Sequence, residues 1–187
     1  MPPRVIVLNG GSSSGKSTVA RCLQAILPDP WLTFGTDTLV DAMPGGGTGI
    51  DFAVGGEVIV GEGFRTLEAA WIQGIAAMAR AGAGVIVDEV FLGGAASQRR
   101  WRDALDGLPV LWVAVRCDGD VAARREAARG DRIAGMAVRQ ADLVHRGVRY
   151  DFEVDTTCTG PEACARAIAG EVISRTPGPS PPPSRRT

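Results

Sequence analysis

The sequence predicts an α/β protein with a parallel sheet that is covered by helices on both faces. Short apolar segments alternate along the chain with longer segments of helical spacing, which is the order expected for consecutive strand–helix units. Two of the apolar segments, residues 85–87 and 110–115, are hydrophobic throughout, as is typical of strands buried on both faces. A glycine-rich loop joins the first apolar segment to the first helical one.

The first strand–helix unit shows how the elements are assigned. Residues 4–8 form a short apolar strand, and residues 15–27 place Val19 and Leu23 on one face of a helix that Pro28 ends. The same reasoning predicts further strands at residues 31–34, 84–88, 110–115 and 152–154, and further helices at residues 37–43, 64–81, 96–105, 118–129, 134–146 and 161–174.

A small insertion interrupts this alternation. Residues 50–54 and 57–60 are two short β-like segments on either side of Gly55 and Gly56, which is the pattern of a β-hairpin. A glycine-rich loop at residues 45–47 precedes them. We therefore expect a hairpin outside the main sheet.

Length and composition suggest one folded domain with a tail. The 187 residues favour a single domain, which we place at residues 1–174. Five of the 12 prolines lie within residues 177–183, so residues 175–187 are predicted to be a disordered, proline-rich tail.

The charge and cysteine content exclude several classes of protein. A net charge of −1 and a pI near 5.9 give no reason to expect a nucleic-acid or anionic-membrane partner. The apolar segment at residues 5–8 is too short for a signal peptide, and no segment has the length of a membrane span. The four cysteines form no CxxC pair, which favours reduced, mostly buried cytosolic thiols. We expect a cytoplasmic protein.

Residues 10–17 match the phosphate-binding pattern G-x-x-x-x-G-K-[ST]. Its glycines allow consecutive backbone N–H groups to face one anion, and the following helix adds the positive end of its dipole. Lys16 can reach the β- and γ-phosphates of ATP, and Ser17 can place a hydroxyl on Mg²⁺. A chance glycine-serine turn is disfavoured because the motif lies between a strand and a helix. The predicted nucleotide-binding residues are Gly10, Gly11, Ser12, Ser13, Ser14, Gly15, Lys16, Ser17 and Thr18.

Two carboxylates follow predicted strands, where α/β sheets bind their ligands. Asp88 ends an apolar strand and is the expected support of Mg²⁺ together with Ser17; Glu89 follows and could assist. The alternative is that Asp88 only caps a turn. Asp37 follows the second strand and could accept the proton of an attacking hydroxyl, or it could be the N-cap of the next helix. The residues alone leave both roles of Asp37 open.

A basic stretch at residues 124–132 is the candidate for charge stabilisation. Arg129 and Arg132 flank Gly130, so they could close over the phosphates as part of a lid. Arg124 and Arg125 are more typical of a solvated helix face. His145 is expected to cap the C-terminus of a helix.

The tryptophans and Phe91 are candidates for the core or for the wall of a pocket. Trp31, Trp101 and Trp112 are expected in the core, whereas Trp71 and Phe91 could line a pocket.

Further short segments match a known family. They are Leu8-Asn9-Gly10-Gly11-Ser12-Ser13, Cys22-Leu23-Gln24, Pro30-Trp31-Leu32, Ala42-Met43-Pro44, Val90-Phe91-Leu92-Gly93-Gly94-Ala95, Leu111-Trp112-Val113, Val115-Arg116-Cys117-Asp118-Gly119 and Val154-Asp155-Thr156-Thr157. With these segments the chain resembles the chloramphenicol phosphotransferases of antibiotic-producing actinomycetes, over roughly residues 4–174.

The resemblance implies a three-layer P-loop kinase core with a five-stranded parallel sheet, and ATP-dependent phosphorylation of the primary hydroxyl of chloramphenicol, which inactivates the antibiotic. It implies that Asp37 is the base and that Arg129 and Arg132 are lid arginines. Three features depart from the family: a short, glycine-rich segment at residues 45–49, Glu89 in place of a second aspartate, and the extra proline-rich tail.

The first departure is expected near the acceptor pocket, so it keeps alternatives open for the substrate. The expected reaction uses ATP and Mg²⁺ and a small-molecule hydroxyl acceptor. One alternative is a kinase of the same fold that acts on another antibiotic, a nucleoside or a sugar acid. Another is a nucleotide-binding module that signals without catalysis, although Asp37 and the arginines argue against it. Whether the chain forms a homo-oligomer is left open.

Overall fold

The fold is built around one five-stranded parallel sheet. The structure, a computed structural model, describes residues 2–44, 49–53, 57–129 and 135–175. The strand order is β2-β5-β1-β6-β7, and each neighbouring pair is parallel. The strands are β1 (Val5–Asn9), β2 (Trp31–Gly35), β5 (Gly84–Glu89), β6 (Val110–Arg116) and β7 (Phe152–Asp155). The predicted α/β fold with a five-stranded parallel sheet is confirmed.

Seven helices are present in the described part of the chain. They are α1 (Lys16–Ile26), α2 (Thr36–Asp41), α3 (Glu62–Arg80), α4 (Ala95–Ala104), α5 (Gly119–Arg129), α6 (Met136–Leu143) and α7 (Pro161–Ser174). The helix expected at residues 134–146 ends earlier than predicted, at Leu143, because turns follow it from Val144 to Gly147. None of these helices has the length and apolar character needed to cross a membrane.

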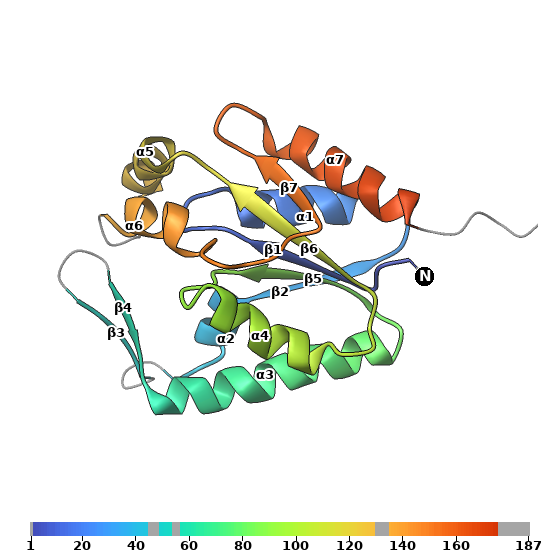
Figure 1. Ribbon diagram of the computed structural model, residues 1–187, viewed down its shortest axis with the longest axis horizontal. Helices are drawn as coiled ribbons and strands as arrows, with labels where there is room; N and C mark the ends of the chain where they lie inside the picture. Colours follow the sequence, from blue (N-terminus) through green and yellow to red (C-terminus); the bar gives the residue numbers. More distant parts are fainter. Residues whose placement is uncertain (1, 45–48, 54–56, 130–134, 176–187) are drawn as a thin grey trace, which may run out of the picture.

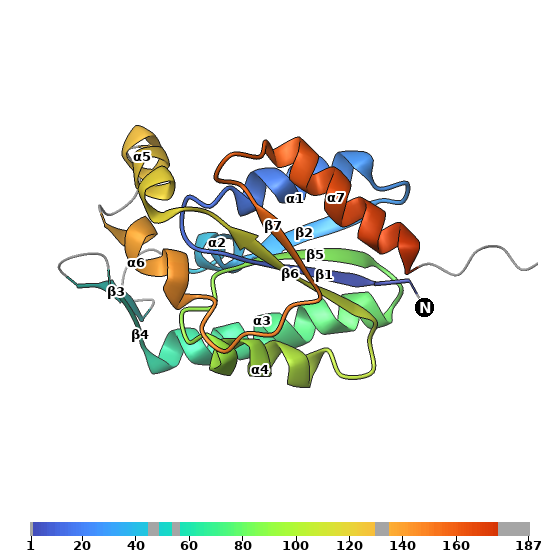
Figure 2. The same cartoon turned by 45° about the horizontal axis from the view of Figure 1, so that its top comes forward.

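Helices cover both faces of the sheet, so the molecule has three layers (Figures 1 and 2). Ile6 and Leu8 of β1 pack with α1 and α7 on one face. Their neighbours Val5 and Val7 pack with α3 and α4 on the other. Because successive side chains of a strand point to opposite faces, the apolar segments of the sequence supply both cores at once.

The parallel strands place their carboxyl ends at one edge of the sheet. The register pairs Leu8 of β1 and Gly35 of β2 with Asp88 of β5. A Cβ atom on Gly35 would lie 2.5 Å from the carbonyl oxygen of Asp88, so only glycine permits this close pairing. The segments that follow β1, β2 and β5 therefore meet at this edge, which is where the predicted site residues lie.

The predicted hairpin insertion is confirmed. Strands β3 (Ile50–Phe52) and β4 (Val58–Val60) pair antiparallel in a separate two-stranded sheet between α2 and α3. Figure 1 shows this hairpin at the same end of the molecule as α5 and α6. That end is the carboxyl edge of the main sheet.

The structure describes all four cysteines but only the first residue of the predicted tail. All four cysteines are free thiols, but only Cys164 is buried; Cys22 and Cys117 are half-buried and Cys158 is exposed. The expectation that most are buried is therefore wrong, because Cys158 lies in the turn after β7 and Cys22 at the flank of the core. The predicted tail at residues 175–187 falls, beyond Arg175, outside the described residues.

Candidate active site

The phosphate loop connects β1 to α1 through a tightly curled backbone. Gly15 has a φ of 89° and Ser13 a φ of 56°, so the loop uses the left-handed region twice before the helix begins at Lys16. A Cβ atom on Gly10 would lie 2.4 Å from the carbonyl oxygen of Val115, which explains the need for glycine at the first position. The N–H groups at the start of α1 and the positive end of its helix dipole make this loop suitable for an anion.

Lys16, Ser17 and Asp88 converge beside this loop. The Lys16 side chain is almost fully buried; its Nζ donates to the Gly11 carbonyl at 2.9 Å and lies 3.9 Å from Asp88 Oδ1. Ser17 Oγ donates to Asp88 Oδ2 at 2.5 Å. A hydroxyl and a carboxylate side by side are oxygen ligands of the kind that Mg²⁺ prefers. No group of three or more His, Cys, Asp or Glu side chains suited to a metal occurs among the described residues, so nucleotide oxygens and water would complete the coordination of an ion here.

Glu89 lies next to Asp88 in a different environment. Its side chain is buried and accepts a hydrogen bond from Thr36 Oγ1 at 2.8 Å. Burial, with a smaller contribution from the charges of Glu68 and Asp88, raises the pKa of Glu89 to about 8. We expected Glu89 to assist Asp88. Its contacts show instead that Glu89 connects β5 to Thr36, the first residue of α2.

Asp37 is the second residue of α2 and its side chain is exposed. The N-cap position is Gly35, without a side-chain cap hydrogen bond, so the alternative that Asp37 is the N-cap is wrong. The helix starts two residues earlier than a cap at Asp37 would require, at Thr36 instead of Thr38. Because Gly35 pairs with Asp88, the start of α2 lies at the same edge of the sheet as Asp88.

Helices α5 and α6 contact the phosphate loop through polar side chains. Arg125 Nη2 donates to the Thr156 carbonyl at 2.7 Å, and Thr156 Oγ1 donates to the Ser14 carbonyl at 2.6 Å. On the other side, Gln140 Oε1 accepts a hydrogen bond from Ser12 N at 2.8 Å. The interpretation of Arg125 as part of a solvated helix face is therefore wrong, whereas Arg124 is exposed as expected. Thr156 lies in one of the segments that carry the family resemblance, but nothing in the sequence indicates that it or Gln140 contacts the loop, because both are far from it along the chain.

The two predicted lid arginines differ in what the structure describes. Arg129 is the last residue of α5 and is exposed. Arg132 lies outside the described residues. Arg129 thus occupies the helix that contacts the phosphate loop through Arg125.

His145 takes part in a hydrogen-bond network rather than a helix cap. Its Nδ1 lies 2.6 Å from the Tyr150 hydroxyl, which also accepts a hydrogen bond from Asn9 Nδ2 at 2.5 Å. Asn9 is buried directly before the phosphate loop, and its Oδ1 accepts a hydrogen bond from Phe91 N. Burial and, to a smaller extent, the positive charge of Arg116 lower the pKa of His145 to about 4. The expected cap is wrong, because the neutral imidazole is oriented toward Tyr150.

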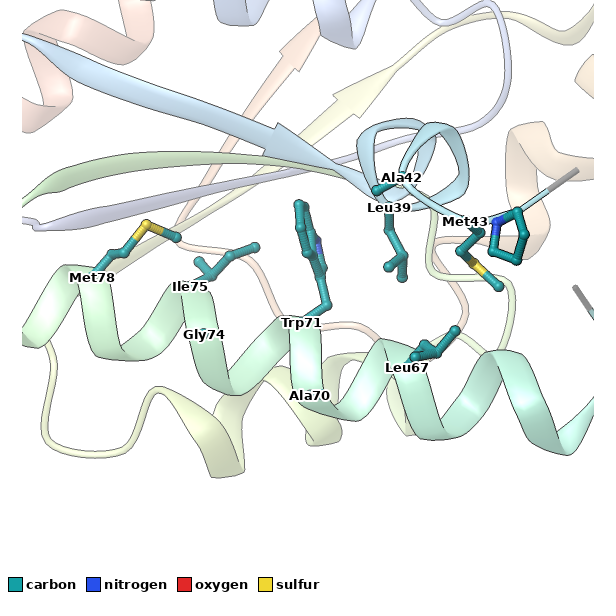
Figure 3. Close-up of a pocket in the computed structure, with 10 residues that line it drawn as sticks. Leu39, Ala42, Met43, Leu67, Ala70, Trp71, Gly74, Ile75 and Met78 are labelled. Atoms are coloured by element: carbon teal, nitrogen blue, oxygen red, sulfur yellow. The ribbon is translucent and has the colours of Figure 1, made fainter.

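Two concavities are of interest in the described part of the chain, one along α2 and α3 and the other beside α6. The first, which we call the α2–α3 pocket, has a volume of about 500 Å³ and a mostly apolar lining, which includes Leu39, Met43, Leu67, Trp71 and Met78. Figure 3 shows the Trp71 indole standing between Ile75 and Leu39. Trp71 lines this pocket, whereas Phe91, the other candidate, is buried in the core. The second, the α6 cleft, has a volume of about 340 Å³ and is lined by Glu57, Val58, Leu92, Arg139, Gln140, Leu143 and Arg146.

The three tryptophans that were expected in the core lie there or against it. Trp101 and Trp112 are buried on the α3–α4 face of the sheet. Trp31 is partly buried and packs against the core on the opposite face.

Comparisons with known proteins agree with the fold. A family model described as chloramphenicol phosphotransferase-like protein matches residues 3–173. A Mycobacterium tuberculosis protein, provisionally named an O-phosphotransferase, is 30% identical over 185 residues, covering 88% of this chain and 80% of the relative.

Solved structures share the fold at low sequence identity. A shikimate kinase from Acinetobacter baumannii, in complex with shikimate, aligns with a TM-score of 0.64 and 19% identity over 93% of this chain and 94% of the kinase. A tunicamycin resistance protein from Deinococcus radiodurans aligns with a TM-score of 0.64 and 22% identity over 92% of this chain and 96% of its own. The predicted P-loop kinase fold is confirmed.

Proposed function

Since this chain belongs to the chloramphenicol phosphotransferase-like family, we propose that it transfers the γ-phosphoryl group of ATP to the primary hydroxyl of chloramphenicol or a close relative. The single observation that carries this proposal is the convergence at one sheet edge of the phosphate loop, Asp88 and the helix that bears Asp37. A nucleotide-binding module without catalysis does not need the acid that follows the second strand.

The phosphate loop binds the nucleotide in this proposal. The N–H groups at the start of α1 and the ammonium of Lys16 hold the β- and γ-phosphates. Ser17 and Asp88 hold Mg²⁺, which supplies neutralisation of phosphate charge when it is bound. Arg129, and Arg132 by its place in the sequence, donate to the oxygens of the transferring group, where negative charge is concentrated in the transition state.

Asp37 is the proposed general base. As the acceptor oxygen forms its bond to the γ-phosphorus, the bond between that phosphorus and the β–γ bridging oxygen breaks. The hydroxyl proton passes to the Asp37 carboxylate, and ADP leaves with the electron pair of the broken bond. The exposed position of Asp37 at the start of α2 leaves room for an acceptor beside it.

Phosphate transfer to a panel of acceptors tests the proposal. The protein is incubated with Mg²⁺ and ATP and with chloramphenicol, a nucleoside or a sugar acid, and the phosphorylated product is identified by mass spectrometry and ³¹P NMR. We expect phosphorylated chloramphenicol, loss of transfer when EDTA removes Mg²⁺, and no transfer by a Lys16→Ala variant. Transfer to a different alcohol would overturn the acceptor, and ATP binding without transfer to any acceptor would overturn the reaction.

A cellular measurement tests the biological consequence of this activity. Because phosphorylation of the primary hydroxyl inactivates the antibiotic, expression of the chain should raise the chloramphenicol concentration that a sensitive bacterium tolerates. The Lys16→Ala variant, expressed at the same level, should give no protection.

A further inference from the structure

The α6 cleft lies directly against the phosphate loop. Gln140 lines the cleft and also accepts a hydrogen bond from Ser12 N of the loop. Leu92, which also lines the cleft, follows Asp88 of β5 by four positions. A molecule in this cleft is therefore bounded by the loop that would hold ATP and by the segment after β5.

The α2–α3 pocket begins beside α2, where Leu39 lines it, and extends along α3 in the other direction. Its lining follows α3 from Leu67 to Met78, and the carbonyl of Met78 accepts a hydrogen bond from Ala83 N, beside the first residue of β5. This end of the pocket lies at the amino edge of the sheet, away from the phosphate loop. Of the two concavities, only the α6 cleft has a lining residue that is hydrogen-bonded to the phosphate loop in the described part of the chain.

The α6 cleft combines apolar walls with positive charge. Val58, Leu92 and Leu143 provide apolar contacts. Arg139 and Arg146 are exposed, and neither has an ion-pair partner within 4.0 Å in the described ranges, which include the one carboxylate of the lining, Glu57. Two arginines and one glutamate in the lining give it a net positive charge, and the planar fork of arginine suits a group with two oxygens.

We propose that the α6 cleft is the acceptor site, and that Arg139 and Arg146 bind a planar, oxygen-bearing group of the acceptor such as a nitro or carboxylate group. The apolar side chains Val58, Leu92 and Leu143 contact the body of the molecule. This inference rests on the proposed function, and it assigns specificity for the acceptor to arginines outside the phosphate loop.

Acceptor kinetics of matched variants test this assignment. Arg139→Ala and Arg146→Ala should each raise the KM for chloramphenicol about tenfold, on the scale of one lost charge-assisted hydrogen bond, while the KM for ATP stays unchanged. The wild type should also prefer chloramphenicol over the analogue in which hydrogen replaces the nitro group, and the double arginine variant should lose that preference. Arg124→Ala on α5 and Leu67→Ala in the α2–α3 pocket are the controls, and neither should change the KM for the acceptor.

The outcomes separate this inference from the proposed function. If the wild type phosphorylates an acceptor but the arginine variants keep its KM and the nitro preference, the inference is wrong and the proposed function stands. A raised KM in Leu67→Ala alone would place the acceptor in the α2–α3 pocket. If the wild type phosphorylates no acceptor, both are wrong. All substituted residues are exposed, and circular dichroism checks that each variant is folded.

Discussion

At the scale of single residues, adjacent carboxyl groups of β5 have opposite roles. Asp88 contacts Ser17 and Lys16 and faces the proposed nucleotide site. Glu89, one residue later, is buried against Thr36. Because successive side chains of a strand point to opposite faces, one carboxylate can serve the site while its neighbour supports the start of α2.

The raised pKa of Glu89 predicts a pH-dependent stability. Its pKa is about 8 in the folded protein, against an ordinary value of 4.5, so between these values the native state holds a proton that the unfolded chain has lost. The free energy of unfolding should therefore fall as the pH rises through this window, with a slope approaching about 1.4 kcal/mol per pH unit for one proton.

A Glu89→Gln variant removes this proton while keeping an acceptor for Thr36. We expect the difference in free energy of unfolding between wild type and variant, from urea denaturation without Mg²⁺ or nucleotide, to change steadily up to about pH 8 and then level off. The lowered pKa of His145, about 4, has the opposite effect on stability, because the free energy of unfolding then rises with pH between about 4 and the ordinary value of 6.5. The window above that value isolates Glu89. Parallel curves for wild type and variant would contradict the raised pKa.

Single residues also show what the sequence can and cannot predict. The loop motif and the strand-end position predicted Lys16, Ser17 and Asp88, which lie together in the structure. Gln140 contacts Ser12 across 128 positions of sequence, and Thr156 contacts Ser14 across 142. Such contacts depend on how α6 and β7 pack, so no local pattern identifies them.

At the scale of secondary-structure elements, α5 and α6 form a hydrogen-bond network with the phosphate loop. Arg125 of α5 reaches Ser14 through Thr156, and Gln140 of α6 reaches Ser12. Glu126, next to Arg125, links α5 to the start of α6. Its two carboxylate oxygens accept hydrogen bonds from the N–H groups of Gly135 and Ala137, each at 2.9 Å. The helix that carries Arg129 is therefore coupled to both sides of the loop.

A conservative substitution of Glu126 tests this hydrogen-bond network best. It is buried, and Gln offers only one acceptor oxygen, so one N–H at the start of α6 would face an amide N–H instead. Glu126→Gln should lower the free energy of unfolding by about 1–3 kcal/mol, measured by urea denaturation.

The control for this substitution is Glu162→Gln. Glu162 forms an exposed ion pair with Arg166, so its loss should change stability by less than about 0.5 kcal/mol. Equal, small effects of both substitutions would show that the Glu126 contacts do not hold α5 and α6 together.

At the scale of the whole molecule, the order of the strands brings distant segments of the chain to one edge. Strand β1 lies in the centre with β5 and β6 beside it, so the phosphate loop is flanked by the segments after both neighbours. The alternation of apolar and helical segments was enough to predict a parallel sheet with helices on both faces. It could not predict the strand order or the location of the two concavities, which depend on packing between elements.

The predicted tail concerns the whole chain. Residues 177–187 contain five prolines and no apolar side chains that could add to a core. Removal of these residues should change neither the melting temperature nor the rate of phosphate transfer, as measured by calorimetry and by the acceptor assay. A melting temperature that falls by several degrees would show that the tail packs on the domain and would shift the predicted boundary of the domain.

The central claim is that Asp37 accepts the proton of the acceptor hydroxyl, and the Asp37→Asn variant tests it most directly. Asn keeps the size of the side chain and, because the N-cap of α2 is Gly35, no cap is removed. Loss of a general base should lower kcat for phosphate transfer by ~10²–10⁴-fold, while the Kd for ATP from equilibrium binding stays the same or falls. Asp41→Asn, at the end of the same helix, should keep full activity. A folded Asp37→Asn variant that retained more than about a tenth of the wild-type kcat would contradict the claim.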